Sequence, residues 1–160
     1  MKTYLVSWLR KSHAGAKLAD FERQRAGPWL VWEAGPWRPP SAKRDTLVAG
    51  PQTRLLASGE SLAIEVEPRA PGEEIRLGRG ADCELVVDDA TLSRVHLVVS
   101  RDAAGRWTVR DAGSRNGTRV DGAPIQAVPV ALERGARIEA GAVRLTFLDS
   151  AGLFFRLRQP

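Results

Sequence analysis

Short runs of alternating apolar and polar residues, separated by turn residues, recur between residues 62 and 148. Clear examples are Leu62–Glu67, Ile75–Leu77, Trp107–Arg110 and Val143–Phe147. A period of two is typical of strands that turn one face to the core and one to solvent. Pairs such as Asn116-Gly117 supply the turns between the runs. Because no long helical pattern interrupts them, the sequence predicts an all-β sandwich of two largely antiparallel sheets.

Residues 1–45 follow a different pattern, which predicts two parts: an N-terminal extension over 1–45 that packs on the main domain, and the β-sandwich over 46–160. The 4, 3 spacing of Ala14, Leu18 and Phe21 predicts a short amphipathic helix at about 15–26, ended by Gly27-Pro28. We expect a brief strand or an extended anchor at Trp29–Trp32. A polar connector is predicted at 41–45, after the prolines at 36, 39 and 40.

Tryptophan is concentrated in this extension, at positions 8, 29, 32 and 37. These side chains either pack onto the main domain and extend its core, or form an exposed patch for a partner. The sequence favours the first interpretation and leaves the second open. At the other end of the chain, Asp149–Arg158 predicts a short helix rather than a last strand.

Composition narrows the possible functions. The 160 residues carry a net charge of +5, with 20 arginines among the 24 basic residues, but no block of like charge forms a nucleic-acid-binding tail. No apolar run approaches the length of a membrane span, so we expect a cytoplasmic protein that contacts neither membrane nor nucleic acid. The single Cys83 excludes an intrachain disulfide, and with only His13 and His96 beside it we expect no metal site and no cofactor.

Three small constellations stand at the ends of predicted strands: Gly78-Arg79, Ser93–His96 and Ser114–Thr118. Arg79 lies between two glycines, which allow a sharp turn and leave its planar fork free for an anion such as phosphate. The second constellation adds the hydroxyl donor of Ser93 and a second cation, Arg94. The third adds the cation of Arg115 and the amide of Asn116, which can bond both the N–H and the C=O of an extended peptide.

Taken singly, each constellation has an ordinary structural interpretation. Gly78-Arg-Gly80 is a common kind of surface turn, Asn116-Gly117 is a hairpin turn, and His96 between apolar neighbours is typically a structural histidine. Ser93, Asp111 and His96 offer the residue types of a hydrolytic triad, but no nucleophile-elbow motif surrounds the serine. We therefore expect no enzymatic activity.

Taken together and in order, the three constellations resemble the forkhead-associated (FHA) domain. The resemblance covers about Leu62–Leu148, and its motifs are Leu77-Gly-Arg79, Leu92-Ser-Arg-Val-His96 and Asp111-Ala-Gly-Ser-Arg-Asn-Gly-Thr118. The linking Val86–Asp89 is also similar to the family's third strand. This resemblance implies a β-sandwich of about eleven strands that binds phosphothreonine peptides through loops at one end, without catalysis.

The resemblance also implies a role for each matching residue. Arg79 would contact the phosphate, Ser93 would donate its hydroxyl to it, and Arg94 would contribute to the phosphate site or its rim. Asn116 would hold the peptide backbone, with Arg115 touching the peptide beside it. The family's structural positions match Gly78, His96 and Gly117. Thr91 would face the residues after the phosphothreonine, where some members carry a basic side chain.

These expectations describe a phosphothreonine-dependent adaptor whose partner is a threonine-phosphorylated protein or peptide. The resemblance further implies a Ser/Thr protein kinase or its substrate as that partner. An alternative is an FHA-like module that binds its partner independently of phosphorylation. The aromatic N-terminal segment motivates this alternative, because it could cover the loops or bind a partner directly.

Overall fold

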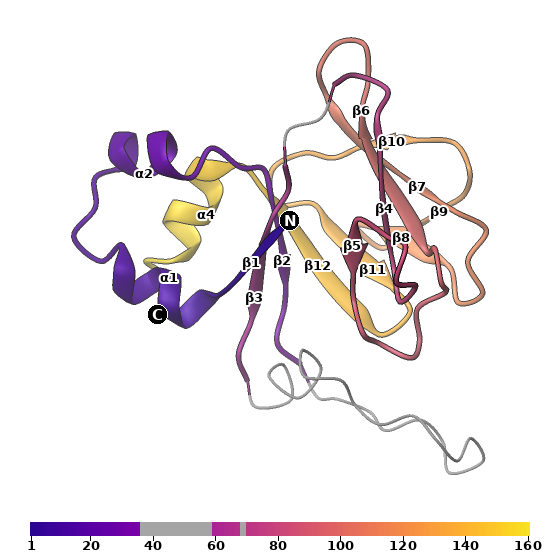
Figure 1. Ribbon diagram of the computed structural model, residues 1–160, viewed down its shortest axis with the longest axis horizontal. Helices are drawn as coiled ribbons and strands as arrows, with labels where there is room; N and C mark the ends of the chain where they lie inside the picture. The colour runs from indigo at the N-terminus through magenta and orange to yellow at the C-terminus, as the bar shows by residue number, and fades with distance from the viewer. Residues whose placement is uncertain (36–58, 68–69) are drawn as a thin grey trace.

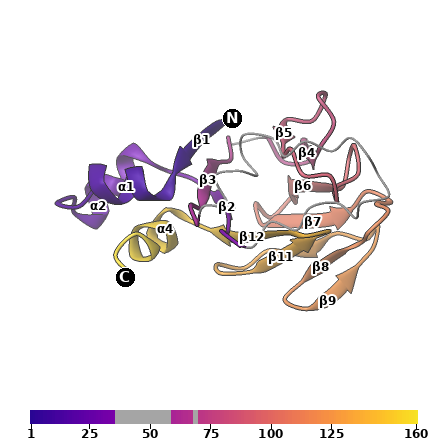
Figure 2. The ribbon, with the colours of Figure 1, turned by 90° about the horizontal axis from the view of Figure 1, so that it is seen from below.

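The computed structural model describes residues 1–35, 59–67 and 70–160. Within these residues, twelve strands form two sheets, and a group of short helices lies to one side of them (Figure 1). The view from below shows the two sheets as stacked layers (Figure 2). The expectation of an all-β sandwich is confirmed.

The larger sheet has seven strands and is antiparallel throughout, in the order β1-β3-β2-β12-β11-β8-β9. Of its first three strands in that order, β1 and β2 belong to the predicted extension over 1–45, whereas β3 belongs to the predicted sandwich over 46–160. The strands are β1 (Lys2–Leu5), β2 (Trp29–Trp32), β3 (Leu62–Glu65), β8 (Thr118–Val120), β9 (Ala123–Ile125), β11 (Arg137–Ala140) and β12 (Val143–Leu148).

The smaller sheet has five strands in the order β10-β7-β6-β4-β5. Its pairs are antiparallel except β4 with β5, where Leu77 lies opposite Leu85 in parallel register. The strands are β4 (Glu74–Gly78), β5 (Leu85–Val86), β6 (Leu97–Arg101), β7 (Trp107–Asp111) and β10 (Val130–Ala131).

The main core fills the space between the sheets, where each strand contributes every second residue, as its alternating sequence predicts. Burying this apolar surface is the main favourable term in folding. The fully or almost fully buried members include Leu30, Ile64, Ile75, Leu77, Leu97, Val99, Val109, Ile138, Val143 and Leu145.

A second, smaller core lies on the outer face of the larger sheet, under the helices α1 (Val6–Ser12), α2 (Leu18–Gln24) and α4 (Ser150–Arg156). Phe21 of α2 and Phe154 of α4 meet there with ring centroids 5.5 Å apart. Figure 1 shows the three helices grouped together, with α4 arriving from the opposite end of the chain. This helical cluster therefore joins the start of the chain to its end.

The helix predicted at about 15–26 is observed as the shorter α2, which begins after an extended Lys17 and ends before Arg25. α1 was not predicted, because seven residues with only two buried side chains give too weak a periodicity. Tertiary packing rather than intrinsic propensity stabilises helices this short. The predicted C-terminal helix is present as α4, where the side chain of Asp149 accepts a hydrogen bond from the backbone N–H of Gly152 at 2.7 Å.

Some tryptophans of the extension pack into the core, and one is exposed. Trp29 and Trp32 are buried in β2, which lies between β3 and β12, so they extend the core. Trp8 is 47% exposed and stacks on Tyr4 with ring centroids 5.7 Å apart. Trp37, the connector predicted at 41–45 and the boundary predicted at residue 45 lie outside the described residues.

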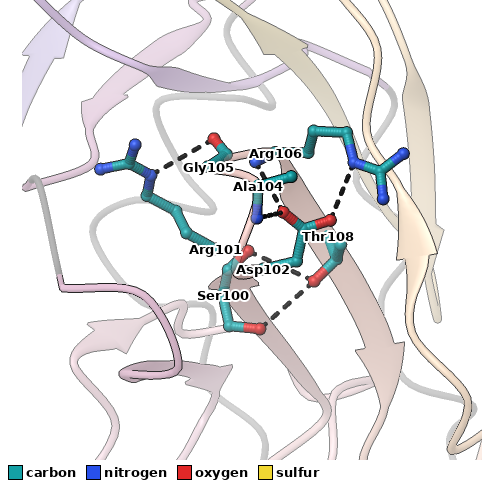
Figure 3. A network of polar contacts seen from close by, with 7 residues as sticks. All are labelled: Ser100, Arg101, Asp102, Ala104, Gly105, Arg106 and Thr108. Atoms are coloured by element: carbon teal, nitrogen blue, oxygen red, sulfur yellow. Dashed lines mark hydrogen bonds and ion pairs between the residues drawn. The ribbon is translucent and has the colours of Figure 1, made fainter.

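The β6–β7 hairpin, at the top of Figure 1, is organised by one carboxylate. Asp102 accepts hydrogen bonds from the backbone N–H groups of Ala104 and Arg106 and from the side chain of Arg106, each at 2.9 Å (Figure 3). The backbone N–H of Arg106 is the main cause that lowers the pKa of this carboxyl, with its guanidinium adding to the effect. Arg106 is thus an exposed arginine that Asp102 holds within the β6–β7 hairpin.

If β2 is integral to the sandwich, truncating its side chains must destabilise the whole fold. We expect Leu30→Ala to lower the free energy of unfolding by about 2–5 kcal/mol, because Leu30 is fully buried in the main core. Denaturant unfolding measures this. Val128→Ala is the control, since Val128 is 74% exposed and its loss should cost less than about 0.5 kcal/mol. Equal effects of the two substitutions would contradict this account of β2.

Candidate functional site

The three constellations come together through hydrogen bonds between loops that are far apart in the sequence. The β4–β5 loop begins at Arg79, the β5–β6 loop carries Ser93 and His96, and the β7–β8 loop carries Arg115 and Asn116. The backbone N–H of Arg79 donates to the carbonyl of Ser93 at 3.1 Å, and that of Arg115 donates to the hydroxyl oxygen of Ser93 at 3.0 Å. Ser93 therefore lies between the other two loops and contacts both.

Glycine at position 78 is required by the close approach of two backbones. A Cβ there would lie 2.7 Å from the carbonyl oxygen of Ser93 and closer still to that of Arg94. Gly80 is similarly tight, and its N–H donates to the carbonyl of Arg94 at 2.9 Å. The glycines on both sides of Arg79 thus let the β4–β5 loop lie directly against the β5–β6 loop.

Arg79 is exposed, and only part of its guanidinium is used within the protein. Its Nε donates to the carbonyl of Leu92 at 2.8 Å, which fixes the direction of the side chain. Within the described residues, no carboxylate lies within ion-pair distance of Arg79, Arg94 or Arg115. Three positive charges without an internal counter-ion favour an anionic ligand.

Arg94 is brought to the same place as Arg79. Both line a hollow of about 310 Å³ beside the β4–β5 loop, together with Gly80, Ala81, Asp82, Cys83 and Val95. The thiol of Cys83 donates to the carbonyl of Arg94 at 3.0 Å. Burial raises the pKa of this thiol, so it stays protonated as the donor.

Ser93 keeps a donor available. Its hydroxyl oxygen accepts from Arg115, and its hydroxyl hydrogen finds no acceptor among the described residues. A hydroxyl can donate its hydrogen while its oxygen accepts a hydrogen bond. Ser93 can therefore serve an acceptor such as a phosphate oxygen.

His96 is fully buried and links two loops. The backbone N–H of Ser93 donates to its Nδ1 at 3.1 Å, so the ring proton is on Nε2, which donates to the carbonyl of Gly117 at 2.9 Å. The ring thereby ties the β5–β6 loop to the β7–β8 loop. The structural role predicted for His96 from the sequence stays a prediction.

Asp111, at the end of β7, shapes the β7–β8 loop from inside. One oxygen accepts from the backbone N–H groups of Gly113 and Ser114, and the other accepts from the hydroxyls of Ser114 and Thr118. Burial alone would raise the pKa of this carboxyl, but the hydrogen bonds from Ser114 and Thr118 outweigh it and lower the pKa. The loop that presents Arg115 and Asn116 is thus folded around a charged carboxylate.

These contacts do not form a hydrolytic triad. The carboxylate of Asp111 is engaged by its own loop, and His96 bonds to the backbone of Ser93 rather than to its hydroxyl. Among the described residues, no group of three or more His, Cys, Asp or Glu side chains is placed to hold a metal ion. In the same part of the chain, no helix is long and apolar enough to cross a membrane.

Asn116 is exposed, and its side-chain amide is held by the neighbouring loop. Its Nδ2 donates to the carbonyl of Thr91 at 2.7 Å. The hydroxyl of Thr91 accepts from the backbone N–H of Ala142 at 2.8 Å and donates to Asp89, and the expectation that Thr91 faces the residues after a phosphothreonine stays a prediction. The sequence indicated only a turn at Gly141, so the contact between that turn and Thr91 had no signal of its own.

An ion pair that the sequence analysis missed also supports the site. Glu84 accepts three hydrogen bonds from Arg76 of β4, at 2.8, 3.2 and 2.9 Å, and a terminal nitrogen of Arg76 donates to the carbonyl of Asp82 at 2.7 Å. The β4–β5 loop is therefore fastened to the strand that precedes Arg79. Hydrogen bonds from the Arg76 side chain and backbone lower the pKa of Glu84 to about 2.

The region that carries the three constellations also resembles known proteins. Residues 75–141 match the family model of the FHA domain. The chain is 33% identical over 100 residues to the glycogen accumulation regulator GarA of Mycolicibacterium smegmatis. The matched segment covers 58% of this chain and 61% of that protein. The chain is also 35% identical over 79 residues to the oxoglutarate dehydrogenase inhibitor of Corynebacterium jeikeium, which covers 49% of this chain and 53% of that protein.

A solved structure with the same fold is the FHA domain of the CT664 protein from Chlamydia trachomatis. It matches with a TM-score of 0.54 over 77% of this chain and 98% of that one, at 15% sequence identity. A likeness at this identity concerns the arrangement of the strands alone.

The Arg76–Glu84 pair predicts a pH-dependent stability. The pKa of Glu84 is about 2 in the folded protein and 4.5 in the absence of these contacts. Its stabilising effect is therefore complete above pH 4.5 and is lost as the pH falls toward 2. We expect Glu84→Gln to lower the free energy of unfolding most at neutral pH and progressively less below pH 4.5. Urea unfolding at pH 7, 4 and 3 measures this, and a difference that stays constant over that range would contradict the assignment.

Proposed function

We propose that this chain, whose residues 75–141 match the family model of the FHA domain, is an adaptor module that binds threonine-phosphorylated proteins. The observation that carries the proposal is that Arg79 and Arg94 line one hollow and that Ser93 is hydrogen-bonded to the backbone of Arg79, while no carboxylate among the described residues pairs with either arginine. Phosphothreonine supplies nearly two negative charges and three strong acceptor oxygens. A guanidinium fork, a second cation and a hydroxyl donor match that ligand.

The peptide beside the phosphate would be held by the β7–β8 loop. Asn116 is exposed there, and with Nδ2 bonded to Thr91 its carbonyl oxygen is the free end of the amide. This oxygen suits a backbone N–H of an extended peptide. Arg115 precedes it in the same loop and adds a cation at the peptide's edge.

The proposal describes a binding module and not an enzyme. The buried imidazole of His96 is committed to two backbone groups, so it has no proton to exchange with a ligand. One of the two relatives carries the name of a regulator and the other that of an inhibitor. Since the chain spans only 61% and 53% of their lengths, their own partners are not transferred to this protein.

The partner that fits this chemistry is a protein phosphorylated on threonine. A Ser/Thr protein kinase or its substrate would supply such a phosphothreonine. We place this function in the cytoplasm, where such a kinase has access to ATP.

Binding independent of phosphorylation is the alternative that the aromatic N-terminal segment suggested. Two of its tryptophans, Trp29 and Trp32, are buried in the larger sheet and cannot cover the loops. The helices beside them lie apart from the β11–β12 turn that borders the candidate site (Figure 1). The test below discriminates between the two modes of binding.

We expect a threonine-phosphorylated peptide to bind far more tightly than the same peptide without phosphate. Arg79→Ala and Ser93→Ala should each weaken the phosphorylated complex by about 10- to 100-fold, because a hydrogen bond to a charged group contributes about 1.5–3 kcal/mol. Isothermal titration calorimetry with a phosphothreonine peptide library as the source of ligands measures this.

Arg106→Ala is the matched control for this experiment. It removes one positive charge from an exposed arginine on the β6–β7 hairpin, which lies at the opposite end of the sandwich from the β4–β5 loop (Figure 1). Its effect on affinity should stay below about twofold, since separated exposed charges are screened by salt. Equal binding of phosphorylated and unphosphorylated peptides would reject the proposal in favour of the phosphate-independent alternative.

A further inference from the structure

We propose that Thr91 is a positioning residue: it locks the β5–β6 loop to the β11–β12 turn and so orients Asn116 before a ligand arrives. This inference rests on the proposed function, since it concerns how the same site is preorganised. It stands beside the expectation that Thr91 faces the bound peptide, which stays a prediction. It also explains why a threonine without charge stands at this position.

The hydroxyl of Thr91 is used in full within the protein. It accepts from the backbone N–H of Ala142 at 2.8 Å and donates to Oδ1 of Asp89, which also accepts from the backbone N–H of Thr91 at 2.8 Å. The side chain thus joins a loop of the smaller sheet to the turn between β11 and β12 of the larger sheet. A side chain held in this way has no hydroxyl donor left for a peptide.

The β11–β12 turn is shaped to receive Thr91. Gly141 has a φ of +55°, and a Cβ there would lie 2.5 Å from the hydroxyl oxygen of Thr91 and 2.7 Å from its carbonyl oxygen. Any larger residue at 141 would push the turn and the loop apart. The lock therefore depends on a glycine some fifty positions away from the threonine it contacts.

The carbonyl of Thr91 sets the orientation of the Asn116 amide. A carbonyl only accepts hydrogen bonds, so the amide end that lies 2.7 Å from it must be the NH₂ group. Because the amide is planar, its oxygen then points away from Thr91. Asn116 is fixed with its acceptor free, as binding of a peptide N–H requires.

Thr91 begins a run of three residues that each hold one candidate binding group. Thr91 holds the side chain of Asn116, the carbonyl of Leu92 holds Nε of Arg79, and the hydroxyl of Ser93 holds the backbone N–H of Arg115. Anchoring the first of these residues therefore limits the motion of all three groups. A site fixed in advance loses less conformational entropy on binding and so binds more tightly.

The first test uses the ligand-free protein and so does not depend on the proposed function. The side-chain NH₂ signals of Asn116 in a ¹⁵N NMR spectrum should shift in Thr91→Val, which lacks the hydroxyl, and stay in place in Thr91→Ser, which keeps it. Unchanged Asn116 signals in Thr91→Val would overturn the proposal, whatever the protein binds.

The second test measures affinity for the phosphothreonine peptide selected from the library. We expect Thr91→Val to weaken binding by about 3- to 10-fold and Thr91→Ser by less than about twofold. In the Asn116→Ala background, Thr91→Val should cost clearly less, because the two residues act through one contact. Fully independent effects of the two substitutions would overturn the proposal.

A glycine pair separates positioning from loss of stability. Gly141→Ala and Gly135→Ala both place a side chain at positive φ, but only the first meets Thr91, since nothing lies within 4 Å of a Cβ at 135. Gly141→Ala should shift the Asn116 signals and weaken peptide binding, whereas Gly135→Ala should lower only the melting temperature. Equal affinities of these two variants at a temperature where both are folded would contradict the lock. If instead the wild-type protein failed to prefer phosphorylated peptides, the proposed function would fail while the NMR test of Thr91 still stood.

Discussion

The two hydrogen bonds of the buried His96 ring are the interaction on which the candidate site depends. They join the backbone of Ser93 to that of Gly117, and so hold together two loops that enter from different strands. Because the ring is fully buried, removing it would leave both backbone groups without water to replace it. The residue that most resembles a catalytic group is thus the one that ties together two loops of the candidate site.

Close contacts between backbones bring the other loops of the candidate site together. Gly78 lets the β4–β5 loop lie against the β5–β6 loop, and Gly141 lets the β11–β12 turn reach Thr91. The exposed arginines are consequently held through their backbones, and Arg79 also through Nε, while no carboxylate among the described residues pairs with them. This separation explains how a site can be rigid and still present three positive charges to solvent, a combination that lowers the cost of binding an anion.

The start of the chain stabilises the sandwich through the larger sheet and does not contribute a candidate site residue. β2 lies between β3 and β12, and Glu33 just after it receives hydrogen bonds from Thr146 and Arg156. The helices at the two ends of the chain then cover the outer face of that sheet. Their contribution is a second apolar core.

The sequence by itself determined the strand-rich fold and the candidate residues Arg79, Ser93 and Asn116, because alternation and short motifs are local properties of the chain. It could not determine α1, whose stability comes from packing, nor that β2 lies between β3 and β12. It also could not determine the contacts of the Thr91 side chain. Only the tertiary structure decided that side chain, because its partner Ala142 is brought to it by the pairing of β11 with β12 and not by any nearby residue.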